Sequence, residues 1–396
     1  MLNSGRRTRR ALLYLLALAA GFALYKHMSA RSLELIPPSS EVAHTTPTTT
    51  ITSSVALHEP PSMPQPDQQD SKVYGRLKVR ADDVKSFRAQ PPTLFVKKTF
   101  TGGAAKRLIF IGDIHGSLKE FNQLLCKVKF KQGQDQVVLV GDLVAKGPDS
   151  VAVVRRARQI DVWAVRGNHD DRVIRWREFL DGPGKTLSLD ELKTLEKSGG
   201  LPYDDFKLKK DHYTIARELS PDDITWLAAL PIIMAMPPPY AQWVVLHGGA
   251  DPSKALMDQV ADDVIVERDI TSSGPTSSSK DGTAWFDVWA DKMKGFTPEA
   301  NIDQNANLDF SVIRYNKIIY GHDAGRNLQI HPVTKGLDSR CVYGGQLTAF
   351  VLPGESLVNV QCASYDSGDK DARKRRRRLG NDNANVKVLH THEELL

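Results

Sequence analysis

Gly112-Asp113-Ile114-His115-Gly116 is the first of three short polar motifs that decide the fold of this chain. The second is Gly141-Asp142-Leu143-Val144-Ala145-Lys146-Gly147-Pro148, and the third is Gly167-Asn168-His169-Asp170. An apolar run precedes each motif, at 108–111, 137–140 and 162–165, and a segment with helical spacing follows each. This pattern predicts an α/β fold in which the runs are buried parallel strands and the motifs lie at the carboxyl ends of those strands.

Two histidines follow similar apolar runs farther along the chain. His247 comes after the run 244–246, and His322 comes after the run 318–321. Open α/β sheets place their ligands outside the carboxyl ends of the strands, so we expect both histidines near the three motifs. Aspartate, asparagine and histidine side chains at one edge predict a site for two divalent metal ions.

The residue types fit two-metal chemistry. Asp142 is the natural bridge, because a carboxylate between two cations reduces their mutual repulsion. Imidazole suits Zn, Fe and Co, and carboxylate and amide oxygens also accept Mn and Mg, so the sequence leaves the identity of the two metals open. A water between such ions loses a proton near neutral pH and can attack a phosphoryl group.

The same residues also have simpler possible roles. Asp113, Asp142 and Asn168 could cap the helices that follow them. His247 could be a turn residue, and His322 could be a hydrogen-bonded core residue. Three motifs in order, each after a strand, favour the metal site over these alternatives.

The three motifs resemble the signature of the calcineurin-like metallophosphoesterase superfamily, GDxHG, GDxxxRG and GNH[DE]. The resemblance covers about residues 105–353. It implies two packed mixed β-sheets flanked by helices, with a two-metal site at the carboxyl ends of the strands. Ala145 and Pro148 are similar to the diadenosine-tetraphosphatase-like branch, as are segments within 219–227, 284–286 and 336–345.

The resemblance also implies roles for individual residues. The positions that match metal ligands are Asp113, His115 and Asp142 for one ion, and Asp142, Asn168, His247 and His322 for the other. His169 matches the acid that protonates the leaving oxygen, and Lys146 and Arg166 match residues that bind phosphate oxygens.

Two positions depart from the pattern of the Ser/Thr phosphoprotein phosphatases. Lys146 replaces an arginine, and an ammonium is a compact point charge that cannot grip two oxygens as a guanidinium does. Ala145 stands where those enzymes place the Asp that orients the catalytic histidine. We therefore expect another group to hold His169.

The amino terminus predicts a membrane anchor. Four arginines at 6–10 precede an apolar run at 11–25, which is shorter than the about 20 residues of a usual spanning helix, although the side chain of Lys26 can lengthen the effective span. We expect an uncleaved anchor at 11–28, with the arginines cytoplasmic and the catalytic domain luminal. The alternative is a cleaved signal peptide with its site at Ala17-Leu18-Ala19. The whole chain resembles the anchored fungal endopolyphosphatases, which implies the vacuole.

Composition divides the chain into four predicted regions: a basic segment and anchor at 1–28, a disordered stalk rich in Pro, Ser and Thr at 29–93, a catalytic domain at 94–362, and a disordered basic tail at 363–396. Within the catalytic domain, we expect a mobile loop at 272–279. The three cysteines, Cys126, Cys341 and Cys362, allow at most one disulfide.

The charge distribution excludes a general nucleic-acid binder. The chain has 53 basic and 47 acidic residues, for a net charge of +6. Six of the basic residues form the run 373–378 and four are the amino-terminal arginines, so the remainder is slightly acidic. A polyanion must therefore be bound locally, around the metal site.

These observations predict a phosphohydrolase that cleaves phosphoanhydride bonds, with inorganic polyphosphate as the favoured substrate. A Ser/Thr protein phosphatase and a dinucleoside-polyphosphate hydrolase are the enzymatic alternatives, and a non-catalytic tethering module is the other class. The expected partners are the phosphoanhydride and a membrane bound through residues 11–28. The oligomeric state stays open.

Overall fold

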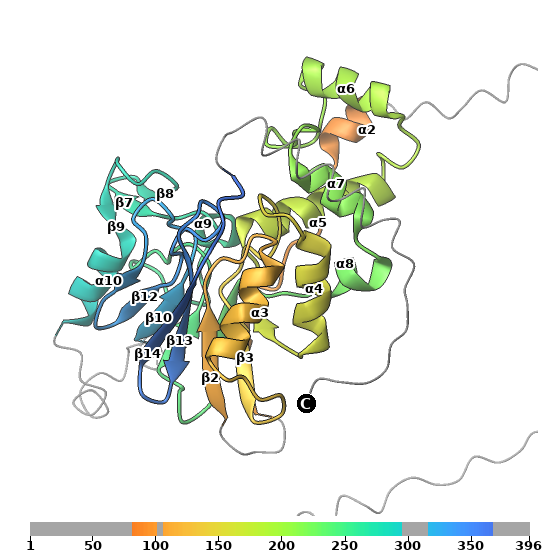
Figure 1. Ribbon diagram of the computed structural model, residues 1–396. Helices are drawn as coiled ribbons and strands as arrows, with labels where there is room; N and C mark the ends of the chain where they lie inside the picture. The colour runs from red at the N-terminus through yellow and green to blue at the C-terminus, as the bar shows by residue number, and fades with distance from the viewer. Residues whose placement is uncertain (1–80, 101–105, 295–315, 367–396) are drawn as a thin grey trace, which may run out of the picture. The chain divides into compact units, whose positions relative to one another are not determined.

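The computed structural model describes residues 81–100, 106–294 and 316–366 (Figure 1). They belong to one compact unit.

The first sheet contains the three strands predicted before the polar motifs. Its order is β14 (Ser356–Gln361), β13 (Gln346–Leu352), β2 (Arg107–Ile111), β3 (Asp135–Leu139) and β4 (Trp163–Ala164). β2, β3 and β4 run parallel, whereas β13 is antiparallel to both β2 and β14. The predicted parallel strands are therefore confirmed.

The second sheet contains the strands that precede His247 and His322. Its order is β1 (Phe95–Lys97), β5 (Ile233–Ala235), β6 (Trp243–Val245), β10 (Lys317–Tyr320), β12 (Thr334–Gly336) and β11 (Gln329–Ile330). β6, β10 and β12 are parallel, and β5 and β11 are antiparallel to their inner neighbours. A third, small sheet joins β8 (Gly274–Thr276), β7 (Asp269–Thr271) and β9 (Thr283–Ala284).

Helices connect the strands. Their bounds are α2 (Ala81–Ser86), α3 (Leu118–Lys127), α4 (Ser150–Gln159), α5 (Asn168–Asp181), α6 (Leu189–Ser198), α7 (Asp211–Glu218), α8 (Pro221–Ala228), α9 (Ala261–Val264) and α10 (Trp285–Met293). Several begin at side chains that accept a hydrogen bond from the first turn. Asp149 accepts from the amide of Ala152 at the start of α4, and Ser220 accepts from the amide of Asp223 at the start of α8.

Successive side chains of β2 point to opposite faces of the first sheet, and this alternation explains how the two sheets pack. Ile109 and Ile111 face the cluster that contains the apolar sides of α3, α4 and α5. Leu108 and Phe110 face the opposite way, into a cluster shared with β5, β6 and β10. On the far side of the second sheet, Val244 packs in a third cluster with the tryptophans of α10. The result is four layers, helix–sheet–sheet–helix, which confirms the predicted fold class.

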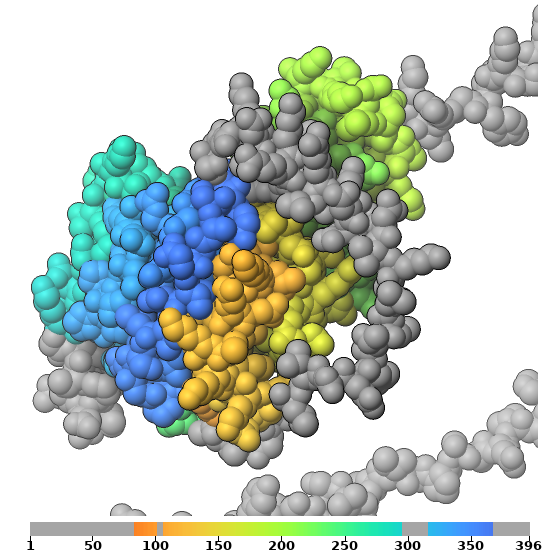
Figure 2. All heavy atoms as spheres, in the orientation of Figure 1, coloured from red at the N-terminus to blue at the C-terminus, as the bar shows by residue number. Residues whose placement is uncertain are grey.

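The carboxyl-terminal strands close the first sheet beside its first helix. α3 packs on β13 and β14, although more than two hundred residues separate them in the sequence. Figure 2 shows these blue strands next to the orange surface of α3. A hydrogen bond from the Tyr365 hydroxyl to Glu120 of α3 extends this contact beyond β14.

Two predicted region boundaries need correction. Residues 81–93 were expected in the disordered stalk, but α2 lies there, with Val84 1% exposed in the core and Lys85 donating to the carbonyl of Leu201. Residues 363–366 likewise pack on the domain. A few apolar residues within a Pro- and Gln-rich stretch are enough to dock it, which an average over composition does not reveal. The segments 1–80 and 367–396 lie outside the described residues.

The region 272–279 was expected to be a mobile loop, but part of it, Gly274–Thr276, is the strand β8. β7 and β8 form a hairpin there, and Arg268 donates to the carbonyl of Ser277. The cysteines agree with the limit of one disulfide, since Cys341 is bonded to Cys362 and Cys126 is free.

The predicted localisation, a single-pass membrane protein with a luminal domain in the vacuole, is contradicted. No helix in the described ranges is long and apolar enough to cross a membrane. The longest of them, α5, has 14 residues, whereas a span needs about 20. The predicted anchor at 11–28 lies outside the described residues, and we withdraw this localisation.

The packing between the sheets yields a stability prediction. Phe110 is fully buried between them, and Phe110→Ala should lower the free energy of unfolding by about 3–5 kcal/mol, because it leaves a cavity in both layers. Urea unfolding of the full chain measures this loss. Leu357→Ala, at a position on β14 that is 40% exposed, is the control and should cost about 1 kcal/mol or less. Equal losses would show that the two sheets do not share a core.

Candidate metal centre

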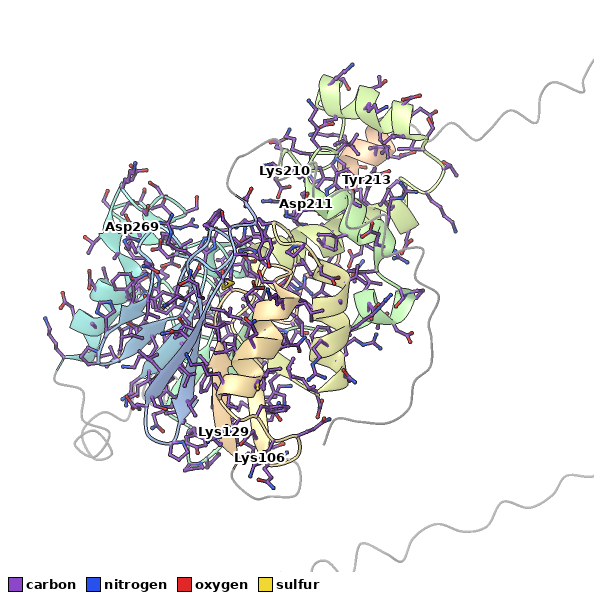
Figure 3. All side chains as sticks on the ribbon, in the orientation of Figure 1. Lys106, Lys129, Lys210, Asp211, Tyr213 and Asp269 are labelled. Carbon is purple, nitrogen blue, oxygen red and sulfur yellow. A yellow bond between two sulfur atoms is a disulfide. The ribbon has the colours of Figure 1, made fainter. Side chains whose placement is uncertain are left out.

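The predicted ligands come from both sheets. β2 leads to Asp113 and His115, β3 leads to Asp142, and α5 begins at Asn168 directly after β4. β6 and β10 of the second sheet lead to His247 and His322. In Figure 3, Lys106 and Lys129 mark the lower end of the first sheet, and Asp211 and Tyr213 of α7 lie toward the opposite end, where the strands of β2 and β3 finish.

The first predicted ligand group is Asp113, His115 and Asp142, and all three side chains are buried. Nε2 of His115 lies 3.4 Å from Oδ2 of Asp142 and 4.0 Å from Oδ2 of Asp113. Two ligands that each lie 2.0–2.2 Å from one ion are at most about 4.4 Å apart. The three side chains are thus close enough to bind the same ion.

The second predicted group shares Asp142. Nε2 of His247 lies 3.4 Å from Oδ1 of Asp142 and 3.2 Å from Oδ1 of Asn168. His322 completes this group, and its ring centroid lies 5.0 Å from that of His247. Because the two oxygens of Asp142 face different histidines, its carboxylate has the placement that a bridge between two ions requires.

Backbone carbonyls orient the histidine rings. Nδ1 of His115 lies 3.1 Å from the carbonyl oxygen of Val144, and Nδ1 of His247 lies 2.8 Å from that of Val140. Nε2 of His322 lies 3.1 Å from the carbonyl oxygen of Val266. A ring nitrogen that donates to a carbonyl leaves the other nitrogen as a lone pair for a metal. His115 and His247 therefore present Nε2, and His322 presents Nδ1.

At the site, the backbone of two glycines lies in close contact with the side chains of predicted ligands. A Cβ on Gly167 would collide with the amide and carboxylate of Asp142, and a Cβ on Gly321 would collide with the carboxylate of Asp113. His115, Asp142 and His322 themselves adopt φ values of 48°, 51° and 68°. Left-handed backbone at non-glycine residues is costly and is concentrated at functional sites.

Burial and neighbouring charges shift the pKa values in opposite directions. Burial, together with the nearby carboxylates of Asp338 and Asp142, raises the pKa of Asp113 well above its usual value. Burial acts the same way on Asp142, but the rings of His247, His169 and His115 outweigh it and hold that pKa well below its usual value. For His247, burial lowers the pKa but the Asp142 carboxylate outweighs burial and raises it to about 9. The surrounding rings therefore favour the ionised form of Asp142.

Asp170, the last residue of the third motif, joins that motif to the second. Its carboxylate accepts hydrogen bonds from the amides of Gly167, Leu143 and Val144, at 3.0, 3.0 and 3.2 Å. The sequence pattern alone indicated no role for Asp170. Its contacts fix the loop that carries Asp142 against the start of α5.

Lys146 lies beside the first ligand group. Its Nζ is 3.0 Å from Nε2 of His115 and 5.4 Å from the ring centroid of Tyr343. Burial lowers the pKa of Lys146, but Asp142 and Tyr343 outweigh it and leave the pKa raised, so the ammonium stays charged. A positive charge at this position fits the predicted contact with phosphate.

Arg166 has a different environment. It is only 3% exposed, its guanidinium donates to Asp171 at 3.2 Å, and it also donates to the carbonyl of Ala228. These contacts hold Arg166 within the protein, so its geometry does not support the predicted contact with phosphate. Arg175, farther along α5, is likewise paired with Asp171 and Asp205.

His169 has a partner that the sequence did not indicate. Nδ1 of His169 lies 2.8 Å from Nε2 of His212 on α7, and the two rings stack with centroids 5.0 Å apart. The amide of His169 also donates to Oδ1 of Asp142. The absence of an Asp at position 145 predicted that some group must hold His169, but His212 has no strand before it and gave no signal of its own.

Asp338 is a second residue without an assigned role. It is 6% exposed, follows β12 by two residues, and accepts a hydrogen bond from the amide of Arg340. The disulfide between Cys341 and Cys362 joins the loop after Asp338 to the end of β14. The same loop carries Tyr343 to Lys146.

Taken together, the donor set fits divalent cations. Two carboxylates, an amide oxygen and three imidazoles with defined free nitrogens form two neighbouring groups that share Asp142, and Zn, Mn, Co and Fe all accept such mixed nitrogen and oxygen ligands. The individual ligand assignments stay predictions that the geometry supports.

Comparisons with known proteins agree with this geometry. The profile of the calcineurin-like phosphoesterases matches residues 106–394. A symmetrical bis(5'-nucleosyl)-tetraphosphatase from Janthinobacterium sp. (strain Marseille) is 26% identical over 302 residues, which cover 66% of this chain and 98% of that protein. A zinc-dependent endopolyphosphatase from Saccharomyces cerevisiae is 24% identical over 283 residues, which cover 65% of this chain and 82% of that protein.

A solved structure is also similar to this chain. The crystal structure of a candidate diadenosine tetraphosphatase superposes with a TM-score of 0.50 and 29% identity, and the match covers 68% of this chain and 99% of that chain.

The shared position of Asp142 leads to a prediction about metal content. Asp142→Asn should reduce bound metal from about two ions per chain to one or fewer, because a neutral amide cannot offset the repulsion between two cations. His247→Ala should remove one ion and leave the other. Elemental analysis of dialysed protein measures both results, and Asp161→Asn, at an exposed carboxylate, is the control. Unchanged metal content in Asp142→Asn would contradict the bridging role.

Proposed function

The chain belongs to the calcineurin-like phosphoesterase family, whose members use two divalent metal ions, and on this premise we propose that it hydrolyses the phosphoanhydride bonds of inorganic polyphosphate. We assign Asp113, His115 and Asp142 to one ion, and Asp142, Asn168, His247 and His322 to the other.

The observation that carries this proposal is the charge pattern of the second motif. Ala145 contributes no carboxylate to the site, and Lys146 places a charged ammonium next to His115. A repetitive polyanion brings several negative charges into the site at once, so an added carboxylate would repel it. A flexible ammonium neutralises charge without imposing the planar geometry of a guanidinium.

The chain's residues would divide the work of hydrolysis. When bound, the two ions lower the pKa of a water and neutralise the oxygens of the phosphoryl group that it attacks. Lys146 would bind an oxygen of that group or of its neighbour. His169, whose ring centroid lies 5.0 Å from that of His115, would donate a hydrogen bond to the leaving oxygen.

One relative supports polyphosphate as the proposed substrate, since the Saccharomyces cerevisiae protein is a zinc-dependent endopolyphosphatase. A second candidate is the hydrolysis of dinucleoside tetraphosphates, the activity named for the Janthinobacterium relative. Tyr343 favours it, because its ring is 36% exposed next to Lys146 and could stack with a nucleobase.

A comparison of three substrates separates these functions. We expect the full chain, loaded with zinc or manganese, to cleave long-chain polyphosphate with a higher kcat/KM than diadenosine tetraphosphate, and both above a phosphoserine peptide. Electrophoretic sizing of the polyphosphate products also distinguishes internal cuts from trimming at the ends. A preference for diadenosine tetraphosphate would support the second candidate, and a preference for the phosphopeptide would refute both.

Lys146 supplies a further test. Lys146→Ala should raise the KM for polyphosphate about tenfold or more, because a charge-assisted hydrogen bond to phosphate is lost, whereas Lys146→Arg should stay close to the unsubstituted protein. The increase in KM should be larger at low ionic strength, where the ammonium is less screened. Lys127→Ala, at a lysine that donates to the carbonyl of Asn359 on the surface, is the control. A KM that is insensitive to Lys146→Ala would remove this residue from the substrate site.

A further inference from the structure

His212 and His169 form a hydrogen-bonded pair next to the predicted metal ligands. Their nearest nitrogens, Nε2 of His212 and Nδ1 of His169, are 2.8 Å apart, and the rings stack at an interplanar angle of 23°. His212 is 4% exposed and lies in the first turn of α7, between Asp211 and Tyr213, which Figure 3 labels.

A hydrogen bond between two imidazoles requires one proton between them. Either Nε2 of His212 carries the proton and donates to Nδ1 of His169, or Nδ1 of His169 carries it and donates to His212. In a neutral imidazole, one nitrogen is a donor and the other is an acceptor. The choice at the shared hydrogen bond therefore determines the state of the outer nitrogen of each ring.

The outer nitrogen of His212 decides between the two arrangements. Nδ1 of His212 is buried and has no hydrogen-bond partner among the described residues. If His169 were the donor, this nitrogen would carry an N–H group buried without an acceptor. If His212 is the donor, the same nitrogen is only a lone pair without a donor. Buried N–H groups without acceptors are rare, and acceptors without donors are less so.

We propose that His212 is a positioning residue that donates its Nε2–H to Nδ1 of His169 and so holds His169 as the tautomer with its proton on Nε2. This inference rests on the proposed function, because it concerns the hydrogen bond that His169 offers to the leaving oxygen. His169 then acts as a neutral donor.

The pair differs in kind from a histidine held by a carboxylate. A carboxylate accepts Nδ1–H and stabilises the imidazolium form, which can give a whole proton to a leaving group. A neutral His212 that donates fills the lone pair of Nδ1, and protonation of His169 would force both rings to change their protons. His212 therefore favours a hydrogen bond to the leaving oxygen over proton transfer to it.

A phosphoanhydride needs no more than such a hydrogen bond. Water supplies the oxygen that forms the new bond to phosphorus and releases its proton to the solvent. The bond between phosphorus and the bridging oxygen breaks, and its electron pair stays on that oxygen, which leaves as part of a phosphate anion. An alkyl phosphate differs, because its alkoxide leaving group is strongly basic and requires the proton.

Nuclear magnetic resonance of the zinc-loaded full chain tests the tautomer directly. In ¹⁵N-histidine-labelled protein, we expect His169 to show a protonated Nε2 and a hydrogen-bonded, unprotonated Nδ1. The His169→Gln variant identifies these signals by their loss. A protonated Nδ1 on His169 would overturn the proposal.

Two variants of nearly equal size test the donor role kinetically. His212→Gln keeps an N–H group near the position of Nε2, and its kcat on polyphosphate should stay within about threefold of the unsubstituted protein. His212→Glu offers only an acceptor, and it should raise the rate on an alkyl phosphate relative to polyphosphate by about tenfold, because a carboxylate stabilises the imidazolium. Equal ratios in the two variants would overturn the donor role.

A control variant on α7 separates a role of His212 in positioning His169 from a role in stabilising the helix. His212→Leu should lower kcat on polyphosphate by about five- to tenfold, as loss of one hydrogen bond implies. Ile215→Ala disturbs the packing of α7 at a buried residue away from the pair. A loss as large in Ile215→Ala would mean that His212 only supports the helix.

The experiments distinguish failure of the proposed function from failure of the inference about His212 and His169. If polyphosphate is not cleaved but His169 carries its proton on Nε2, the substrate assignment is wrong and the pair stands. If polyphosphate is cleaved and His169 carries its proton on Nδ1, the pair is assigned wrongly and the substrate stands.

Discussion

A single buried carboxylate joins the two sheets at the site. Asp142 follows β3 of the first sheet, and its two oxygens face His115, from the same sheet, and His247, from the second. A buried charge without compensation costs several kcal/mol, so these contacts restrict how the sheets can pack at this end. The glycines of the motifs permit the approach, since a side chain on Gly167 would collide with Asp142. The fold and the metal centre are thus parts of one arrangement.

Much of this arrangement could be predicted from the sequence, because strand ends carry their own signals. Apolar runs followed by Gly-Asp, Gly-Asn-His, Gly-His or, at His247, His-Gly place six candidate ligands without knowledge of the tertiary structure. The pairing of strands could not be predicted in the same way. The runs before Asp113 and His322 look alike, yet they belong to different sheets, and only the alternating burial along β2 and β10 separates the sheets.

Residues outside this pattern were missed for a physical reason. His212 lies on a short helix, 43 residues after His169, and Tyr343 and Asp338 lie in a loop that the disulfide at Cys341 joins to Cys362 after β14. Contacts of this kind depend on how distant segments pack, and local periodicity carries no information about them. Arg166 shows the reverse case. It stands directly before the third motif and was assigned to substrate, but it is buried and donates to Asp171 and Ala228.

In the structure, the two departures from the protein-phosphatase pattern, Ala145 and Lys146, are consistent with each other. Without a carboxylate at Ala145, His169 would have lost its orientation, and His212 from another element supplies a partner of different chemistry. A carboxylate partner favours a cationic acid, whereas a neutral imidazole that donates favours a neutral one. The same absence removes a negative charge from the site, and Lys146 adds a positive one. Both changes suit a leaving group that needs no proton and a substrate with many negative charges. A phosphoanhydride chain has both of these properties.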